Sequence, residues 1–144
     1  MKISTCELYL FLRNIHYYEE GIYDIIKYYM NTYTFKDNDE LHIGINLWCD
    51  NRNKCIENYG HISEWDVSNI TNMQWMFANC YYFNQDISRW DISNVYNMEN
   101  MFFNAPKFNQ DISGWDVRKV TRTNDMFNFC FIKNKYKPIF KIDL

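Results

Sequence analysis

The sequence predicts an α/β repeat fold, in which three strand–turn–helix units of 25 residues stack with parallel strands behind a helical N-terminal cap. The segment that begins at His61 recurs twice at an interval of 25 residues, which places Trp65, Trp90 and Trp115 at equivalent positions. Residues 1–60 lack this repeat and carry apolar residues at helical spacing. A fixed period of this length is typical of stacked repeat proteins, because one unit cannot bury its apolar face alone.

The first half of each unit carries isoleucine, tryptophan and valine at fixed places, as Ile62, Trp65 and Val67 show. Trp65 and Val67 alternate with polar neighbours, which predicts a half-buried strand. Strands of adjacent units should pair in parallel, about 4.8 Å apart.

The second half of each unit carries Met73, Met76, Phe77 and Cys80, spaced three, one and three apart. This spacing predicts one face of a short helical segment. Cys80, Ala105 and Cys130 share one repeat position, where we expect a small residue in the core. The recurring residues that we expect to form the buried core are Ile62, Trp65, Val67, Met76, Phe77, Ile87, Trp90, Ile92, Met101, Phe102, Ile112, Trp115, Val117, Met126 and Phe127.

Three parts of one compact domain follow from these patterns: a helical cap over 1–60, the repeats over 61–131 and a basic tail over 132–144. The third copy loses the consensus after Cys130, as a terminal unit does. We expect three helices in the cap. The first has an apolar stripe of Ile15, Tyr18, Ile22, Ile25, Ile26 and Tyr29, and the second, capped by Asp37 or Asn38, has a stripe of Leu41, Ile45 and Trp48. The third is shorter, runs to Tyr59 and is stopped by Gly60.

The run WDVSNITNMQWMFANCYYFNQDIS, with its copies, resembles the BspA-like leucine-rich-repeat surface-protein family. That family is also described as a domain of unknown function in mollicute lipoproteins and giant-virus proteins. The resemblance implies a short leucine-rich-repeat-like solenoid that binds other molecules and implies no catalysis. The abundance of residues with AT-rich codons (Asn, Ile, Lys, Tyr and Phe) also indicates an AT-rich genome, such as that of a large DNA virus or a mollicute.

The sequence offers little support for catalysis, a metal or a membrane span. It shows no nucleophile–base signature and no glycine-rich phosphate loop. The spacing of His42, Cys49, Cys55 and His61 is wider than structural zinc sites use. No signal peptide and no long apolar run is apparent, so we expect an intracellular protein with free thiols. We therefore expect neither enzymatic activity nor a cofactor.

Aspartates recur at two positions of the unit, and like charges at this spacing repel one another. The first set is Asp66, Asp91 and Asp116, and the second is Asp86 and Asp111. Turn amides that bind each carboxylate are the economical solution, and calcium is the less favoured one, because calcium-binding repeats use glycine-rich turns.

The positions that differ between copies predict the binding surface, because recurring positions are explained by stacking. Large aromatic residues and arginines at such positions are typical interface anchors. The candidates are Glu64, Trp75, Arg89, Tyr96, Phe103 and Arg118. The alternative is that these residues pack against the N-terminal helices or loops. We expect an unidentified protein partner.

Two other functions also fit the sequence. Residues 1–35 could act as an F-box-like adaptor that recruits a ubiquitin-ligase component, although the leucine–proline start of an F-box is missing. Residues 118–144 carry seven basic and two acidic residues, and Lys133, Lys135, Lys137 and Lys141 alternate with aromatic residues. Such a tail could hold nucleic acid, but we favour a solvated tail whose aromatic residues pack on the last repeat.

Overall fold

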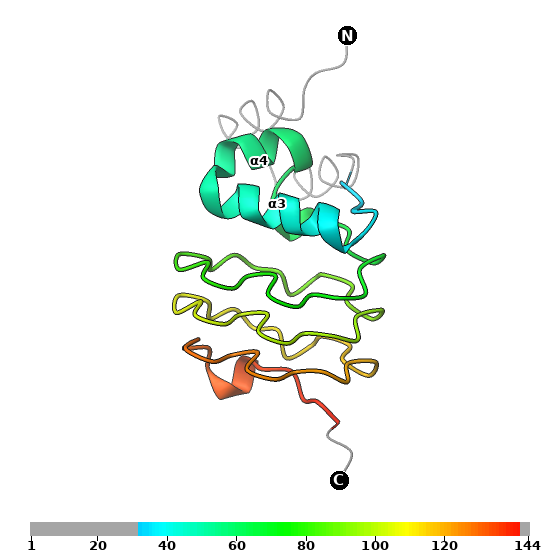
Figure 1. Ribbon diagram of the computed structural model, residues 1–144, viewed down its shortest axis with the longest axis vertical. Helices are drawn as coiled ribbons and strands as arrows, with labels where there is room; N and C mark the ends of the chain where they lie inside the picture. The colour runs from blue at the N-terminus through cyan, green and yellow to red at the C-terminus, as the bar shows by residue number, and fades with distance from the viewer. Residues whose placement is uncertain (1–31, 142–144) are drawn as a thin grey trace, which may run out of the picture.

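The computed structural model describes residues 32–141, which form a stack with two helices at one end and three layers of turns below them (Figure 1). Helix α3 spans Asn38–Asp50 and α4 spans Arg52–Tyr59, and two single-turn 3₁₀ helices, η1 and η2, cover Ile62–Glu64 and Asn134–Tyr136. Each layer corresponds to one 25-residue copy. The stripe predicted over Ile15–Tyr29 lies outside the described residues.

Helix α3 begins, and helix α4 ends, where the sequence predicts. The Asp37 carboxylate accepts a hydrogen bond from the Glu40 backbone N–H, which satisfies one of the donors left unpaired at the start of α3. The predicted stripe of α3 is confirmed, since Leu41, Ile45 and Trp48 are buried. Gly60, with φ of 74°, ends α4 through its backbone N–H.

Each layer is a run of four-residue turns, and a buried residue stands at nearly every corner. In the first copy, backbone N–H groups donate to the carbonyl three residues earlier in several turns, among them Ile62–Trp65, Val67–Ile70, Met73–Met76, Phe77–Cys80 and Cys80–Phe83. The second copy repeats each of the named turns, and the third repeats all of them except the last. The recurring apolar residues therefore bracket turns, and the residues between them are exposed or half-buried, with Glu99 as the exception.

The predicted α/β fold of strand–turn–helix units, and with it the leucine-rich-repeat-like solenoid, is wrong. Within residues 32–141 no strand forms, and only three isolated parallel bridges occur: Thr34–Asp66, Asn72–Asn97 and Asn97–Arg122. The segment 73–80 is not a helix either. Consecutive four-residue turns place their corners at spacings of three, one and three, so they produce the same apolar pattern as a helical face.

Residues with left-handed backbone conformation keep these turns from becoming a helix. Trp75 and Asn79 have φ of 61°, and each is the third residue of its turn. A positive φ at that place is the signature of a type II turn. The same positions of the other copies are also left-handed: Asn100, Asn104, Asp125 and Phe129.

Backbone hydrogen bonds join adjacent layers in a repeated register. The N–H groups of Met73, Trp75, Phe77 and Asn79 donate to carbonyl groups that lie 24 residues later, at distances of 2.8–3.0 Å. The equivalent bonds of the next interface run from Met98 to Arg122, Asn100 to Asn124, Phe102 to Met126 and Asn104 to Asn128. The backbone N–H group of every second residue in this segment thus donates to a carbonyl of the adjacent layer. These bonds fix the register, so that each residue lies near its equivalent in the next copy.

Aromatic columns fill the interior of the stack. Phe77, Phe102 and Phe127 stack with ring centroids 5.2 and 5.8 Å apart and nearly parallel planes. The Trp90 ring stacks on Trp65 at 6.2 Å. The indole N–H of Trp90 donates to the Ile62 carbonyl in the layer above at 2.9 Å, and Trp115 makes the equivalent bond.

Helix α3 lies directly on the first layer and closes that end of the core. Its first residue, Asn38, accepts hydrogen bonds from the backbone N–H groups of Thr71 and Asn72 at 3.1 Å. Gly44 allows a close approach, because a Cβ atom there would lie 2.8 Å from the Phe35 ring and 3.3 Å from the Trp65 ring. Aromatic packing thereby continues from the layers into the helices.

We expect Trp90→Ala to lower the free energy of unfolding by about 3–5 kcal/mol, because it removes a ring that is 4% exposed and an interlayer hydrogen bond. Chemical denaturation of both proteins measures this change. Arg89→Ala, at the exposed neighbouring position, should change the value by less than about 0.5 kcal/mol. Equal stabilities for Trp90→Ala and Arg89→Ala contradict this core.

Because of the left-handed turns, we expect the glycine variant at Asn100 to be more stable than the alanine variant, which is the reverse of the usual order. Asn100→Ala should cost about 1 kcal/mol at its φ of 55°, because alanine lacks the short polar side chain that lets asparagine adopt left-handed backbone. Asn100→Gly should be better tolerated, because glycine has no Cβ atom. At exposed Lys107, which lacks a positive φ, alanine should be the more stable of the two. Urea denaturation of the four variants measures their free energies of unfolding. If alanine is more stable than glycine at both positions, the left-handed turns are contradicted.

Candidate binding surface

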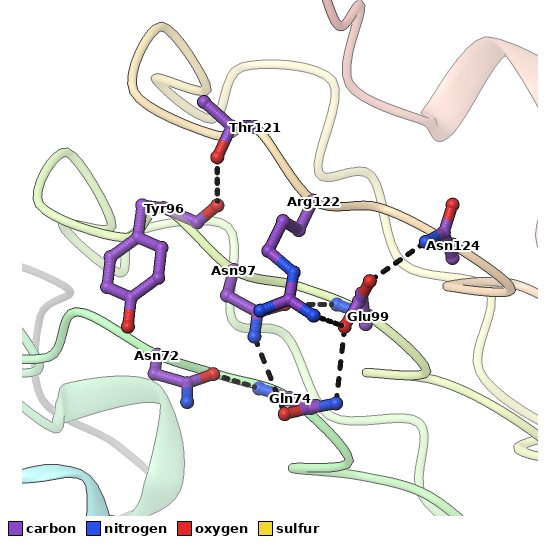
Figure 2. Close-up of polar contacts among 8 residues, drawn as sticks. All are labelled: Asn72, Gln74, Tyr96, Asn97, Glu99, Thr121, Arg122 and Asn124. Carbon is purple, nitrogen blue, oxygen red and sulfur yellow. Dashed lines mark hydrogen bonds and ion pairs between the residues drawn. The ribbon is translucent and has the colours of Figure 1, made fainter.

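A ladder of polar side chains runs down the layers beside the first interlayer bonds (Figure 2). Asn72 and Asn97 stand at equivalent positions, and each side-chain oxygen accepts the backbone N–H two residues later, at 2.9 and 3.0 Å. The Asn97 amide also reaches the Gln74 side-chain oxygen at 3.5 Å. These asparagines hold the chain in the turns that begin the second half of the first two copies.

Glu99 is the centre of this polar ladder. It is almost fully buried, and its carboxylate accepts hydrogen bonds from the side-chain amides of Gln74 in the layer above, at 3.3 Å, and Asn124 in the layer below, at 2.8 Å. The Arg122 guanidinium pairs with it at 2.8 Å. One carboxylate therefore links three layers, and its partners are provided by the protein itself.

The recurring aspartates bind turn amides, as the sequence predicts. Asp66, Asp91 and Asp116 each accept the backbone N–H two residues later at 3.0–3.2 Å. Asp86 and Asp111 repeat the arrangement in front of the next turn. Within residues 32–141, no group of three or more acidic, histidine or cysteine side chains could hold a metal ion.

Three aromatic side chains from successive layers form an outer row, which we call the aromatic row: Trp75, Phe103 and Phe129. Phe103 contacts Trp75 edge-on at 5.6 Å and Phe129 at 5.7 Å between ring centroids. Trp75 is 47% exposed and Phe129 is 63% exposed, while Phe103 between them is half-buried. The row thus offers a continuous apolar strip across all three layers.

The backbone conformation at both ends of the aromatic row is unfavourable for the residues found there. Trp75 and Phe129 adopt φ of 61° and 56°, where residues other than Gly, Asn and Asp cost about 1–2 kcal/mol. The equivalent positions in the other copies hold Asn100 and Asp125 in the first case and Asn79 and Asn104 in the second. The turns do not require aromatic residues at either position.

The structure brings only two of the six predicted binding residues into direct ring contact, Trp75 and Phe103. Tyr96 is exposed, and its backbone carbonyl accepts from Thr121 in the polar ladder. Arg118 is exposed and forms a bidentate pair with Asp116 in its own turn. In the same first part of the unit, Glu64 is half-buried beside Ser63, and Arg89 is exposed.

Two features of this surface are absent from the predicted set. Phe129 stands where the other copies have asparagine, so a comparison of the copies could have found it. The burial of Glu99 could not be found this way. The equivalent positions hold Gln74 and Asn124, and such variation between copies is typical of solvent-exposed positions. Its charge is accommodated only because neighbouring layers supply two amides and a guanidinium.

The C-terminal segment packs on the third layer. The Tyr136 carbonyl accepts from the Ile112 backbone N–H at 3.0 Å, and Tyr136 and Phe140 pack against the core. The packing predicted for these two aromatic residues is confirmed, whereas Phe131 is largely exposed. Lys133 and Lys135 lie over the Tyr136 ring at 5.5 and 5.1 Å.

The described helices are too short and too polar to cross a membrane. The predicted adaptor segment, 1–35, falls almost entirely outside the described residues.

One family model, described as "Mycoplasma protein of unknown function, DUF285", matches residues 45–136. The match covers α4, all three layers and η2, and it begins within α3. No curated protein and no solved structure matches the chain.

We expect Glu99→Ala to lower the free energy of unfolding by about 1–3 kcal/mol, because two amides and a guanidinium lose their shared acceptor. Arg122→Ala should cost less than about 1 kcal/mol, since the arginine side chain is 55% exposed. Urea denaturation gives both values. If Arg122→Ala costs as much as Glu99→Ala, the carboxylate is not the centre of the polar ladder.

Proposed function

We propose that this chain, which belongs to the Mycoplasma protein family of unknown function DUF285, is a non-catalytic module that binds another protein through the aromatic row. The observation that supports the proposal is the pair of strained aromatic residues, Trp75 and Phe129. Both are exposed, and both stand where the same turn in another copy has Asn or Asp. Strain that stability does not require tends to persist where a side chain serves a function.

The chemistry of the aromatic row suits a protein partner. Exposed aromatic side chains supply large contact areas at low entropic cost and are enriched among the residues that dominate binding energies. Trp75 and Phe129 are held by Phe103 between them, so little further ordering is needed when a partner binds. The polar ladder beside the row keeps the layers in register and thereby fixes the spacing of the three rings.

The resemblance to the BspA-like surface-protein family contributes one element to the proposal, which is the expectation that the chain binds other molecules. An intracellular location is part of the proposal and is supported by the described cysteines, none of which forms a disulfide. Nothing in the described residues favours the adaptor function.

Nucleic-acid binding by the tail is the less favoured alternative, since Phe131 is its one largely exposed ring among Phe131, Tyr136 and Phe140. Base stacking needs open aromatic faces. Lys133 and Lys135 lie over the Tyr136 ring, and Lys137 lies over Phe127 at 5.3 Å. Lys133, Lys135 and Lys137 thus interact with aromatic rings of the third layer and of the tail itself.

The test replaces the aromatic row with residues that the chain's own copies carry: Trp75→Asn, Phe103→Ala and Phe129→Asn. Asparagine relieves the strain at the two left-handed positions, so we expect this triple variant to fold at least as stably as the parent. A protein captured by the parent chain, identified by mass spectrometry and then purified, should bind the triple variant at least about tenfold more weakly. Isothermal titration calorimetry measures both affinities.

Tyr82→Ala is the matched control, because Tyr82 is an aromatic residue that is 85% exposed and lies outside the row. It should bind as the parent does. A purified partner that binds the triple variant and the parent equally well excludes the aromatic row as the binding surface.

A further inference from the structure

Four backbone N–H groups face outward at the lower end of the stack, below the third layer (Figure 1). In this layer, four carbonyl groups accept hydrogen bonds from the second layer, and they belong to Arg122, Asn124, Met126 and Asn128. The C=O and N–H of one trans peptide group point in opposite directions, so the N–H group of each following residue points away from the second layer. These following residues, which we call the open row, are Thr123, Asp125, Phe127 and Phe129.

The open row repeats the register of the interface above it. The N–H groups that hold the third layer there, at 2.8–2.9 Å, are those of the equivalent residues Met98, Asn100, Phe102 and Asn104. Within residues 32–141, the N–H groups of the open row donate no hydrogen bond, and all four of its residues are exposed or half-buried. A segment with backbone carbonyl groups at every second residue therefore fits this edge, as added peptides fit the open edge of a sheet.

The C-terminal segment packs on the third layer but leaves the open row without partners. The Ile112 N–H donates to the Tyr136 carbonyl at 3.0 Å, and Ile112 belongs to the first half of its copy. No hydrogen bond joins the described part of this segment, 132–141, to residues 123–129. The open row is therefore accessible beside the segment.

The charge at this end of the stack favours an acidic occupant. Residues 118–141 carry seven basic residues and one acidic residue. Lys137 lies over the ring of Phe127 in the open row, at 5.3 Å from the ring centroid. Lys133 and Lys135 are exposed, and none of these three lysines has an ion-pair partner among the described residues. Carboxylates on a segment that binds the open row would complement these ammonium groups.

A second copy of this chain does not suit the open row. If two copies met at their lower ends, N–H groups would face N–H groups. If the upper end of one copy met the lower end of another, α3 would separate the two edges. This helix lies on the first layer, where His42 Nε2 is 3.3 Å from the Gln74 carbonyl. The occupant that fits is an acidic segment of another protein.

We propose that the open row is a docking site for an acidic, extended segment of another protein. The backbone carbonyl groups of this segment accept the four N–H groups, and its carboxylates pair with Lys133, Lys135 and Lys137. Main-chain hydrogen bonds supply the affinity, as in other cases of edge addition, and the lysines select the charge. This inference goes beyond the function proposed above and does not depend on it, because it uses main-chain groups and lysines rather than the rings of the aromatic row.

The experiment measures amide hydrogen exchange of the isotopically labelled full chain by NMR, with and without a blocked peptide that alternates Glu and Thr. In the free chain, the amides of the open row should exchange faster than their equivalents in the second copy, which are bonded. Millimolar peptide should slow exchange of the open row at least about tenfold and leave the second copy unchanged.

Charge variants test the role of the lysines. Lys133→Gln combined with Lys135→Gln should weaken peptide binding by about threefold or more. Lys36→Gln combined with Lys54→Gln is the matched control, because these two lysines are exposed at the other end of the stack, and it should bind as the parent does.

Two further variants concern the open row and the aromatic row. Asp125→Asn installs the residue that the second copy has at this position, Asn100, and should bind the peptide more tightly, because it removes a negative charge. Trp75→Asn removes a ring of the aromatic row and should leave peptide binding unchanged. The two binding proposals can therefore fail separately.

Three results would overturn the proposal. The first is slow exchange of the open row in the free chain, and the second is unchanged exchange at millimolar peptide. The third is equal protection by a peptide that alternates Lys and Thr or by oligothymidylate. Equal protection by oligothymidylate would show that this end of the stack binds polyanions such as nucleic acid, rather than backbone carbonyl groups of an acidic segment.

Discussion

The backbone hydrogen bonds between layers are the interaction on which the rest of this structure depends. Alternate N–H groups along the second half of one copy donate to the next copy, and this is possible because left-handed residues interrupt every turn there. Without those residues, a run with this apolar spacing could satisfy its own backbone as a helix. Each layer would then have few groups left to offer its neighbour.

The stacked register places equal side chains above one another, and this determines both the interior and the surface. Recurring Phe and Trp residues become columns in the core, and each lower tryptophan bonds a carbonyl of the layer above. Residues that differ between copies, such as Trp75 and Phe103, are brought within contact on the outside. The aromatic row is therefore a product of the same register that builds the core.

The sequence predicts some parts of this arrangement well and others badly, for identifiable reasons. The cap at Asp37 and the end of α4 at Gly60 follow from local chemistry, and so do the aspartate turns. The strand–turn–helix unit fails because Met73, Met76, Phe77 and Cys80 have a spacing that suits both a helix and successive turns. The decisive feature is the left-handed backbone. Glycine at these positions would have indicated it in the sequence, but the chain has Trp75, Asn79 and Phe129 there. Part of the candidate surface could be predicted, because Trp75 and Phe103 differ between copies, whereas the burial of Glu99 depends on contacts between layers.

The most direct test of this account measures NMR scalar couplings across individual hydrogen bonds in the labelled protein. We predict couplings from the amide nitrogen of Trp75 to the carbonyl carbon of Glu99 and from Phe77 to Met101, with the equivalent pair from Asn100 to Asn124 in the next interface. Couplings within residues 73–80 from each amide to the carbonyl four residues earlier would show a helix instead, and would contradict the stack of turns.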